Sequence, residues 1–191
     1  MISGILLAAG AGVRFGGRKL LYPLADGTPL GIASLRNLRA AVPRTVAVVR
    51  AGDRELLEAL SAEGVPVLEC VDAALGMGHT LAAAVAHESS AQGWVVALGD
   101  MPYIAVETIA RIAEELGRGA PIVVPVFGGQ RGHPVGFSRA FGAQLMALRG
   151  DSGARAILAA HPAQIRQVEV SDAGVVKDID TPPDVGALAG S

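Results

Sequence analysis

The residues best suited to chemistry stand near the start of this 191-residue chain, in residues 5–19. An apolar run there leads into four glycines and three basic residues: Gly10, Gly12, Gly16, Gly17, Arg14, Arg18 and Lys19. Glycines let backbone N–H groups converge on phosphate oxygens, and Arg and Lys supply positive charge. We therefore expect this loop to bind a triphosphate, with Arg14 and Lys19 beside the phosphates. A tight turn would explain the glycines but not the basic residues.

A dinucleotide loop is the main rival interpretation of the same segment. The glycine order is Gly-x-Gly-x-x-x-Gly, one residue away from the dinucleotide fingerprint. The second expected strand ends in Arg50, where that fingerprint would favour an acidic residue. The spacing after Gly12 also departs from a Walker loop.

Aspartates later in the chain could hold a metal ion. Asp100 follows an apolar run and precedes Pro102, so its carboxylate could bind Mg²⁺ whose other ligands are phosphates, although an Asp that opens a turn is the alternative. Asp178 and Asp180 point to the same side of an extended segment. Two nearby carboxylates repel each other unless a cation lies close to them, so metal binding is the simpler account.

Asp184 has a different expected role. Thr181 and Pro182 are typical of the cap and the first position of a helix, and Asp184 follows three residues after the cap. We expect Asp184 to cap this helix start and not to bind metal.

Short apolar runs alternate with stretches of helical periodicity along the chain. Strands are expected at 2–8, 45–50, 65–71, 93–98, 121–126 and 165–170, and helices at 31–41, 54–63, 80–87 and 106–116. This alternation predicts one three-layer α/β domain over residues 1–191, with a mostly parallel sheet covered on both faces. In such sheets ligands bind beyond the carboxyl ends of the strands, where the polar clusters lie.

Composition narrows the class of protein. The chain is 51% hydrophobic and 18% charged, which excludes a disordered protein, and its net charge of −2 does not favour nucleic-acid binding. The first residues lack the basic segment of a signal peptide, and no apolar run reaches the roughly 18 residues of a membrane helix. The lone Cys70 lies in an apolar run and is expected to be buried. These features favour a soluble, cytoplasmic protein without disulfides.

Three further loops carry weaker signals. Arg131 and His133 lie in a glycine-rich loop and could contact an anionic second substrate, although a lone His is more often a surface or satisfied residue. Asp151 or Ser152 would cap a following helix, or bind a ligand; both interpretations stay open. Residues 75–81 begin a helix whose free N–H groups suit a base or a phosphate.

Taken together, these motifs resemble the molybdenum cofactor nucleotidyltransferases, the MobA-like branch of the nucleotide-diphospho-sugar transferase superfamily. The resemblance covers almost the whole chain, and the motifs keep the family's order. They are Leu7-Ala8-Ala9-Gly10 through Arg14, Gly16 and Lys19; Gly76-Met77-Gly78; Gly99-Asp100-Met101-Pro102; Arg131-Gly132-His133-Pro134; Gly150-Asp151-Ser152-Gly153-Ala154-Arg155; and Asp178-Ile179-Asp180-Thr181-Pro182.

The resemblance implies a Rossmann-like fold with a mixed, mostly parallel sheet and a site for a nucleoside triphosphate. The nucleotide-binding residues that it implies are Leu7, Ala8, Ala9, Gly10, Gly12, Arg14, Lys19, Gly76, Gly78 and Thr80. It also implies that Asp100 holds Mg²⁺ together with a carboxylate of the Asp178 and Asp180 pair. Lys19, Arg14 and Asp100 would then serve the chemistry, and the acceptor would meet Arg131, His133, Asp151 and Arg155.

The first loop indicates a branch of that family. Guanylyltransferases typically carry Leu-Ala-Gly-Gly, whereas this chain has Leu7-Ala8-Ala9-Gly10, which resembles the cytidylyltransferases. The Cβ of Ala9 would crowd a purine more than glycine would, so Ala9 is a candidate base-selecting position. One departure concerns residues 78–81, where the family commonly has Ser-x-Ser-Leu and this chain places the bulky His79.

The function that we expect is Mg²⁺-dependent transfer of CMP from CTP to a phosphate-bearing acceptor, with release of pyrophosphate. The resemblance makes molybdopterin the expected acceptor and a molybdenum enzyme the expected recipient of the product. An acceptor phosphate is already anionic, so no general base is assigned, and positioning and charge neutralisation suffice.

Three alternatives stay open. One is cytidylyl or uridylyl transfer to a sugar or alcohol phosphate. Another is an NAD(P)H-dependent oxidoreductase, in which Arg50 and Arg14 meet a 2′-phosphate and His79 or His133 donates a proton. The last is a maturation factor that binds cofactor without turnover, although such a protein has no need of the metal carboxylates.

Overall fold

The computed structural model describes residues 1–10, 12, 15 and 18–185. Its strands are Ile2–Leu7 (β1), Thr45–Arg50 (β2), Val67–Cys70 (β3), Gly93–Leu98 (β4), Ile122–Phe127 (β5), Gln130–Arg131 (β6), Val135–Ser138 (β7) and Ile165–Glu169 (β8). Its α-helices are Leu30–Ala41 (α1), Arg54–Ala62 (α2), Met77–His87 (α3), Val106–Gly117 (α4), Gly142–Met146 (α5) and Arg155–Ala160 (α6).

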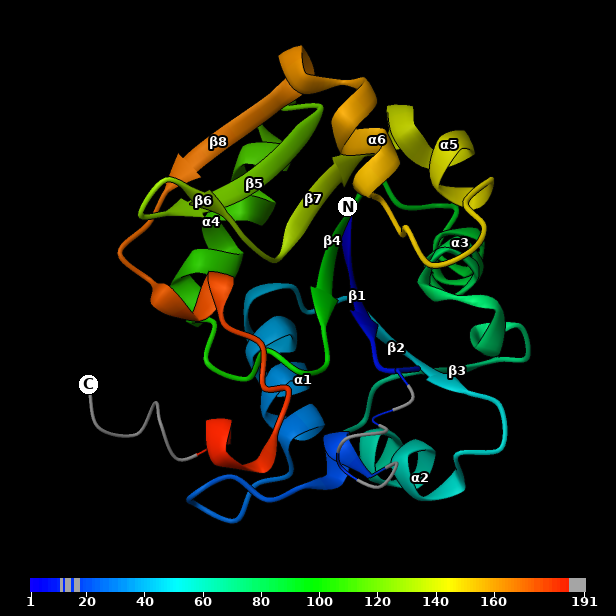
Figure 1. Cartoon of the computed structure of the whole chain (residues 1–191). Helices are drawn as coiled ribbons and strands as arrows, with labels where there is room; N and C mark the ends of the chain where they lie inside the picture. The colour runs from blue at the N-terminus through cyan, green and yellow to red at the C-terminus, as the bar shows by residue number, and fades with distance from the viewer. Residues whose placement is uncertain (11, 13–14, 16–17, 186–191) are drawn as a thin grey trace.

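The strands form a single mixed sheet in the order β3-β2-β1-β4-β7-β5-β6, with β8 paired to β5 (Figure 1). β3, β2, β1 and β4 run parallel to one another. β7 is antiparallel to both of its neighbours, β4 and β5. The carboxyl ends of the four parallel strands therefore meet at the same edge, where ligands bind in sheets of this kind.

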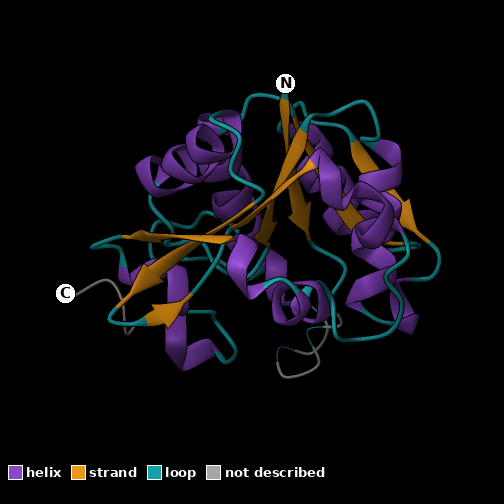
Figure 2. Cartoon of the chain, turned by 90° about the horizontal axis from the view of Figure 1, so that it is seen from above, coloured by secondary structure: helices purple, strands orange, loops and turns teal. Residues whose placement is uncertain are grey.

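Helices cover both faces of the sheet, as seen from above in Figure 2. Because successive side chains of extended chain point to opposite faces, Leu6 of β1 and the following Ala8 enter one core, and Ile5 and Leu7 of β1 enter the other. The first core includes residues of α1, α2 and α4, and the second includes residues of α3 and α5. The expected three-layer, Rossmann-like architecture with a mixed, mostly parallel sheet is confirmed.

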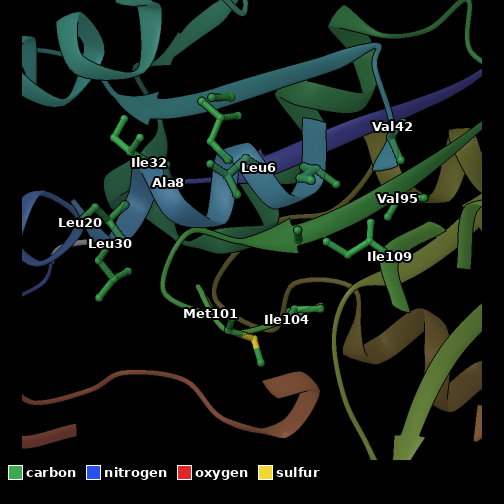
Figure 3. Packing of buried hydrophobic residues seen from close by; sticks show 14 of the residues in the cluster. Leu6, Ala8, Leu20, Leu30, Ile32, Val42, Val95, Met101, Ile104 and Ile109 are labelled. Carbon is green, nitrogen blue, oxygen red and sulfur yellow. The ribbon is translucent and has the colours of Figure 1, made fainter. Parts of the chain in front are cut away.

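The first core extends under the loop that carries Asp100. Figure 3 shows Met101 and Ile104 of this loop in the same cluster as Leu20 and Leu30. The Gly99 N–H donates to the carbonyl of Leu7 at 2.9 Å, so the loop is tied to the end of β1. This packing fixes the backbone on which Asp100 stands.

Two polar side chains of α1 hold the same loop from the other side. Ser34 Oγ donates to the carbonyl of Gly99 at 2.9 Å. Asn37 Nδ2 donates to the carbonyls of Pro102 and Ile104 at 2.9 and 3.1 Å. These bonds satisfy backbone oxygens that the loop would otherwise leave without partners.

The segment that carries the two later aspartates lies beside the Asp100 loop. The Ile179 N–H donates to the carbonyl of Asp100 at 3.0 Å, and the Ile179 side chain is fully buried. Asp178 and Asp180 are exposed on the opposite side, as the alternation predicts. Two sequence-distant segments are therefore joined at the backbone.

Asp184 acts in the turn that follows, Pro182–Val185 (η7). Its Oδ2 accepts hydrogen bonds from the N–H groups of Asp180 and Thr181 and from Thr181 Oγ, at 2.7–3.0 Å. The Thr181 hydroxyl bond, followed by the backbone bonds, lowers the pKa of the Asp184 carboxyl. This arrangement agrees with the expected role in capping.

The sequence located the parallel half of the sheet more accurately than the other half. The strands at 45–50 and 93–98 have the expected bounds, and α3 begins three residues earlier than expected, directly after Gly76. The helix expected after residues 150–154 is present as α6, whereas the two antiparallel strands β6 and β7 and the helix α5 were not predicted. Each of these three elements has five residues or fewer, too short for periodicity to mark it.

One expected cap is wrong. Ala154 occupies the position before α6 and makes no side-chain capping bond, so neither Asp151 nor Ser152 caps that helix. The glycine-rich turn delays the start of α6 beyond both residues. Cys70 is buried, as expected.

None of the helices in the described part of the chain is both long enough and apolar enough to cross a membrane.

Replacement of Ile179 by Ala tests whether this side chain fixes the carboxylate segment. The buried cavity left by the truncation should lower the free energy of unfolding by about 2–4 kcal/mol. Chemical denaturation measures this change. Val71, which is 81% exposed, provides the control, since Val71→Ala should change stability by less than about 0.5 kcal/mol. Equal effects of the two substitutions would contradict the packing described here.

Candidate functional site

Three carboxylates gather at the carboxyl end of β4. Asp100, Asp178 and Asp180 each offer an oxygen, and these oxygens lie within 4.8 Å of one another. Asp100 is partly buried, and the other two are exposed. The structure therefore brings together all three aspartates that the sequence analysis considered as metal ligands.

Lys19, at the start of the short helix Lys19–Leu21 (η2), lies between two of these carboxylates. Its Nζ is 2.8 Å from Asp100 Oδ2 and 3.2 Å from Asp180 Oδ1, and its side chain is only 12% exposed. Burial acts to lower the pKa of Lys19, but the hydrogen bonds and charges of Asp100 and Asp180 outweigh it and raise the pKa. The ammonium is therefore charged at neutral pH and reduces the repulsion between the carboxylates.

The donor set fits a divalent cation. Asp100 Oδ1 is buried and has no hydrogen-bond partner among the described residues, which costs free energy unless something else binds it. The Lys19 ammonium donates to the other carboxylate oxygen, Oδ2. Carboxylate oxygens are preferred ligands of Mg²⁺, which retains positions for water and phosphate oxygens. Asp100 with Asp178 or Asp180 could hold such an ion.

A cavity of about 590 Å³ extends from the carboxylates along the sheet edge. It is lined by Leu7, Ala9, Gly10, Gly12, Phe15, Lys19, Leu20, Arg50, Ala73, Ala74, Gly76, Met77, Thr80, Leu98, Asp100, Asp151 and Asp180. It therefore reaches from β4, past β1, to the ends of β2 and β3. Lys19, Asp100 and Asp180 lie at its carboxylate end, and Arg50 lies toward its far end with Ala73, Ala74 and Met77.

Most of the expected nucleotide-binding residues line this cavity. Ala8 does not, because its side chain packs into the core on the opposite face of the sheet. Gly78 does not line it either, and packs against the backbone of residues 149–150. Arg14 lies outside the described residues, so its place in the site stays a prediction.

The start of α3 is joined to the loop at 149–151. Gly76 has φ +120°, and a Cβ on it would collide with the backbone of Gly150 and with Asp151. The Gly78 N–H donates to the carbonyl of Gly150 at 2.8 Å, and His79 Nδ1 accepts from the Gly150 N–H at 3.3 Å. His79 thus has a structural contact that accounts for its bulk, and the loop places Asp151 at the cavity wall.

His133 lies near the carboxylates, at the entry to β7. Its backbone N–H donates to the carbonyl of Val175, and its ring Nδ1 is buried without a partner among residues 1–10, 12, 15 and 18–185. Burial lowers the pKa of the His133 imidazole, although the charges of Asp100 and Asp178 act to raise it. The positive charge of Arg155 also acts to lower the pKa of His133. His133 is therefore largely neutral at pH 7 and lies within electrostatic reach of the cluster.

The four expected acceptor residues are not equally placed. Asp151 lines the cavity, whereas Arg131, His133 and Arg155 do not. Arg131 is exposed on the short strand β6, and Arg155 is exposed at the start of α6. An acceptor that met all four would extend beyond the cavity.

Three residues of the site were not predicted from the sequence as part of it. Arg50 was considered only for a 2′-phosphate in a dinucleotide site, yet it lines the cavity. Ser34 and Asn37 hold the Asp100 loop from α1 and gave no signal, because isolated polar residues on a helix are ordinary. The sequence did carry a signal for Arg50, because it is a basic residue at the end of a largely apolar strand, at the edge of the sheet where ligands bind.

Comparison with known proteins identifies the family. Residues 4–167 match the MobA-like NTP transferase domain. The purine catabolism protein PucB of Bacillus subtilis is 32% identical, with 94% of this chain and 91% of PucB aligned. The nicotine blue oxidoreductase of Paenarthrobacter nicotinovorans is 29% identical, over 94% and 92% of the two chains. A molybdenum cofactor guanylyltransferase of Cupriavidus pinatubonensis is 34% identical, over 65% and 61%.

A solved structure shows the same architecture. Rv0371c of Mycobacterium tuberculosis superimposes with a TM-score of 0.82 and is 31% identical, with 96% of this chain and 95% of that chain covered. It has also been crystallised with manganese. The chain belongs to the MobA-like NTP transferase family. The relatives do not confirm the expected cytidylyltransferase branch.

Replacement of Asp100 by Asn tests the metal site. Asn keeps the shape of the side chain but removes the charge, so Mn²⁺ affinity should fall by more than about tenfold. Electron paramagnetic resonance of free and bound Mn²⁺ measures the affinity. Asp72→Asn is the matched control, because Asp72 lies outside the cluster and its side chain makes no capping bond. Unchanged Mn²⁺ binding in Asp100→Asn would rule out this residue as a ligand.

Proposed function

We propose that this member of the MobA-like NTP transferase family transfers CMP from CTP to a phosphate-bearing acceptor, in a reaction that depends on Mg²⁺ and releases pyrophosphate. The observation that carries the proposal is the buried, unpartnered Asp100 Oδ1 beside Lys19 and a second carboxylate, at the wall of a cavity large enough for a nucleotide. A dinucleotide site has no need of such a carboxylate cluster.

The bound cation would neutralise phosphate charge, which is the contribution that phosphoryl chemistry needs most. Asp100 and Asp180 would hold it, with Asp178 as the alternative to Asp180. The backbone bond from Ile179 to Asp100 and the contacts of Ser34 and Asn37 keep these carboxylates in place. The protein thus supplies position and charge, and no side chain needs to act as a base.

Lys19 would act both in the ligand-free site and in the site that holds a cation. Its ammonium neutralises the carboxylates in the ligand-free protein, as the two ion pairs show. When the carboxylates hold a cation, Nζ would turn to the phosphate oxygens and stabilise the charge that passes to the leaving pyrophosphate. Arg14 would assist from the glycine loop.

The preference for CTP rests on Ala9. This residue is buried and lines the cavity, and its Cβ would crowd a purine more than a glycine would. The resemblance to molybdenum cofactor enzymes and the guanylyltransferase relative make molybdopterin the proposed acceptor. In either case the acceptor phosphate would attack the α-phosphorus of CTP and pyrophosphate would leave, so a sugar or alcohol phosphate acceptor would use the same carboxylates.

A redox reaction is the second candidate, because the nicotine blue oxidoreductase aligns over nearly its whole length. That reaction would use NADPH in the same cavity and would not depend on the three carboxylates. Protection of the protein from thermal unfolding by NADPH in the absence of metal would favour it. Protection by CTP only with Mg²⁺ would favour the transferase.

A screen for pyrophosphate release tests the proposed function. The protein is incubated with CTP, GTP, ATP or UTP and Mg²⁺, with and without molybdopterin. CTP with molybdopterin should give the highest rate, and removal of Mg²⁺ by a chelator should abolish it. Pyrophosphate release from no nucleotide under any condition would contradict nucleotidyl transfer.

Two variants locate the chemistry within the same assay. Asp100→Ala should abolish turnover without unfolding the protein, because its metal ligand is lost. Lys19→Ala should lower the rate by about two orders of magnitude or more, since one preorganised charge on a developing anion contributes about that much. Arg54→Gln is a charge control on an exposed residue, and it should keep the wild-type rate. An unchanged rate in Lys19→Ala would remove Lys19 from the catalytic residues.

A further inference from the structure

Arg50 stands at the far end of the cavity, and within the described residues its guanidinium is only partly hydrogen-bonded. It ends β2, next to the end of β1, and lines the cavity. Its Nε is buried and has no hydrogen-bond partner in the part of the chain that the structure describes. Within the described residues, its guanidinium donates a hydrogen bond from Nη2 to the carbonyl of Ala9 at 3.4 Å, which is long for an N–H···O bond.

The acidic residues near Arg50 are engaged elsewhere. Asp53 Oδ1 accepts from the Leu56 N–H and caps α2. Glu69, one residue before the β3 partner of Arg50, accepts from the Gly52 N–H at 3.0 Å. In the part of the chain that the structure describes, no ion pair includes Arg50. A partly buried guanidinium without a carboxylate needs an acceptor from a ligand.

The sheet order indicates which part of a nucleotide meets Arg50. The carboxylates lie at the end of β4 and Arg50 at the end of β2, with β1 between them. Adjacent strands lie about 4.8 Å apart, so the two sites are separated by about 10 Å. If the phosphates lie at the carboxylates, the base extends toward Arg50, Ala73 and Ala74, where the wall is otherwise apolar.

We propose that Arg50 determines base specificity and that, together with the Ala9 carbonyl, it recognises cytosine. A guanidinium offers two parallel donors and no acceptor. Cytosine presents two adjacent acceptors, O2 and N3, followed by the N4 amino donor. Arg50 would donate to O2 and N3, and the Ala9 carbonyl, held only by a long bond, would accept from N4. The inference rests on the proposed function.

The same geometry disfavours the competing bases. Uracil carries an N3–H, which would meet a donor of Arg50 and leave both groups unpaired. The Watson–Crick edge of guanine has donors at N1 and N2, which conflict with the guanidinium in the same way. Guanine could pair with Arg50 only by turning its other edge, with the O6 and N7 acceptors, toward it. A site built to bond one edge rejects its analogue because buried polar groups then lose their partners.

Nucleotide binding measured with Mg²⁺ tests this role separately from turnover. Dissociation constants for CTP, UTP and GTP are obtained by calorimetry for the wild-type protein, Arg50→Lys and Arg50→Gln. Lys keeps the charge but loses the fork of two donors, so the preference for CTP over UTP should fall by roughly tenfold. The Gln amide presents one donor and one acceptor, which suit O2 and N3–H of uracil. The preference of the Arg50→Gln variant should therefore move further toward UTP.

Arg54→Gln is the matched control, since Arg54 is exposed, lies four residues away and does not line the cavity. It should keep the wild-type preference, and thermal unfolding verifies that each variant folds. An unchanged preference in both Arg50 variants, or an equal loss of affinity for all three nucleotides, would overturn the proposal. A wild-type protein that binds CTP but releases no pyrophosphate would contradict the proposed function and leave the base-recognition result valid. A wild-type protein that binds none of the nucleotides would contradict both.

Discussion

The repulsion among Asp100, Asp178 and Asp180 is the constraint on which the site depends. Three carboxylates within 4.8 Å of one another are unfavourable unless a positive charge lies among them. Lys19 supplies that charge in the structure, from a helix that begins directly after the glycine loop. The fold must therefore bring the N-terminal loop, the end of β4 and a C-terminal segment to the same place and hold them there against the repulsion.

The backbone and the core meet this requirement. Ile179 anchors the C-terminal carboxylates with a buried side chain and a hydrogen bond to Asp100. Gly99 lies against the end of β1, and α1 holds the loop that follows. Lys19 is held in turn by Leu20, which packs in the core beside it. Each charged group thus stands next to a residue that is fixed by packing, so the site is preorganised by apolar contacts.

Much of this arrangement could be predicted from the sequence, for reasons that are local. Apolar runs marked the parallel strands, and alternation at residues 178–180 placed Ile179 inside and its neighbours outside. The carboxyl-end rule then predicted that Asp100 and the Asp178 and Asp180 pair would lie at the binding edge. What could not be predicted depends on tertiary contacts. The pairing of Lys19 with Asp100, the bonds of Ser34 and Asn37, and the contact between His79 and Gly150 join residues far apart in the chain, and no short pattern encodes them.

In the proposed function, nucleotide and metal bind at one coupled site. If the metal raises the affinity for the nucleotide by some factor, the nucleotide must raise the affinity for the metal by the same factor. The most direct test is a calorimetric titration of CTP into the protein with and without Mg²⁺, together with a titration of Mn²⁺ with and without CTP. We expect CTP to bind at least tenfold more tightly with the metal, and Mn²⁺ to gain affinity from CTP in return. CTP affinity that does not change with metal would contradict the account.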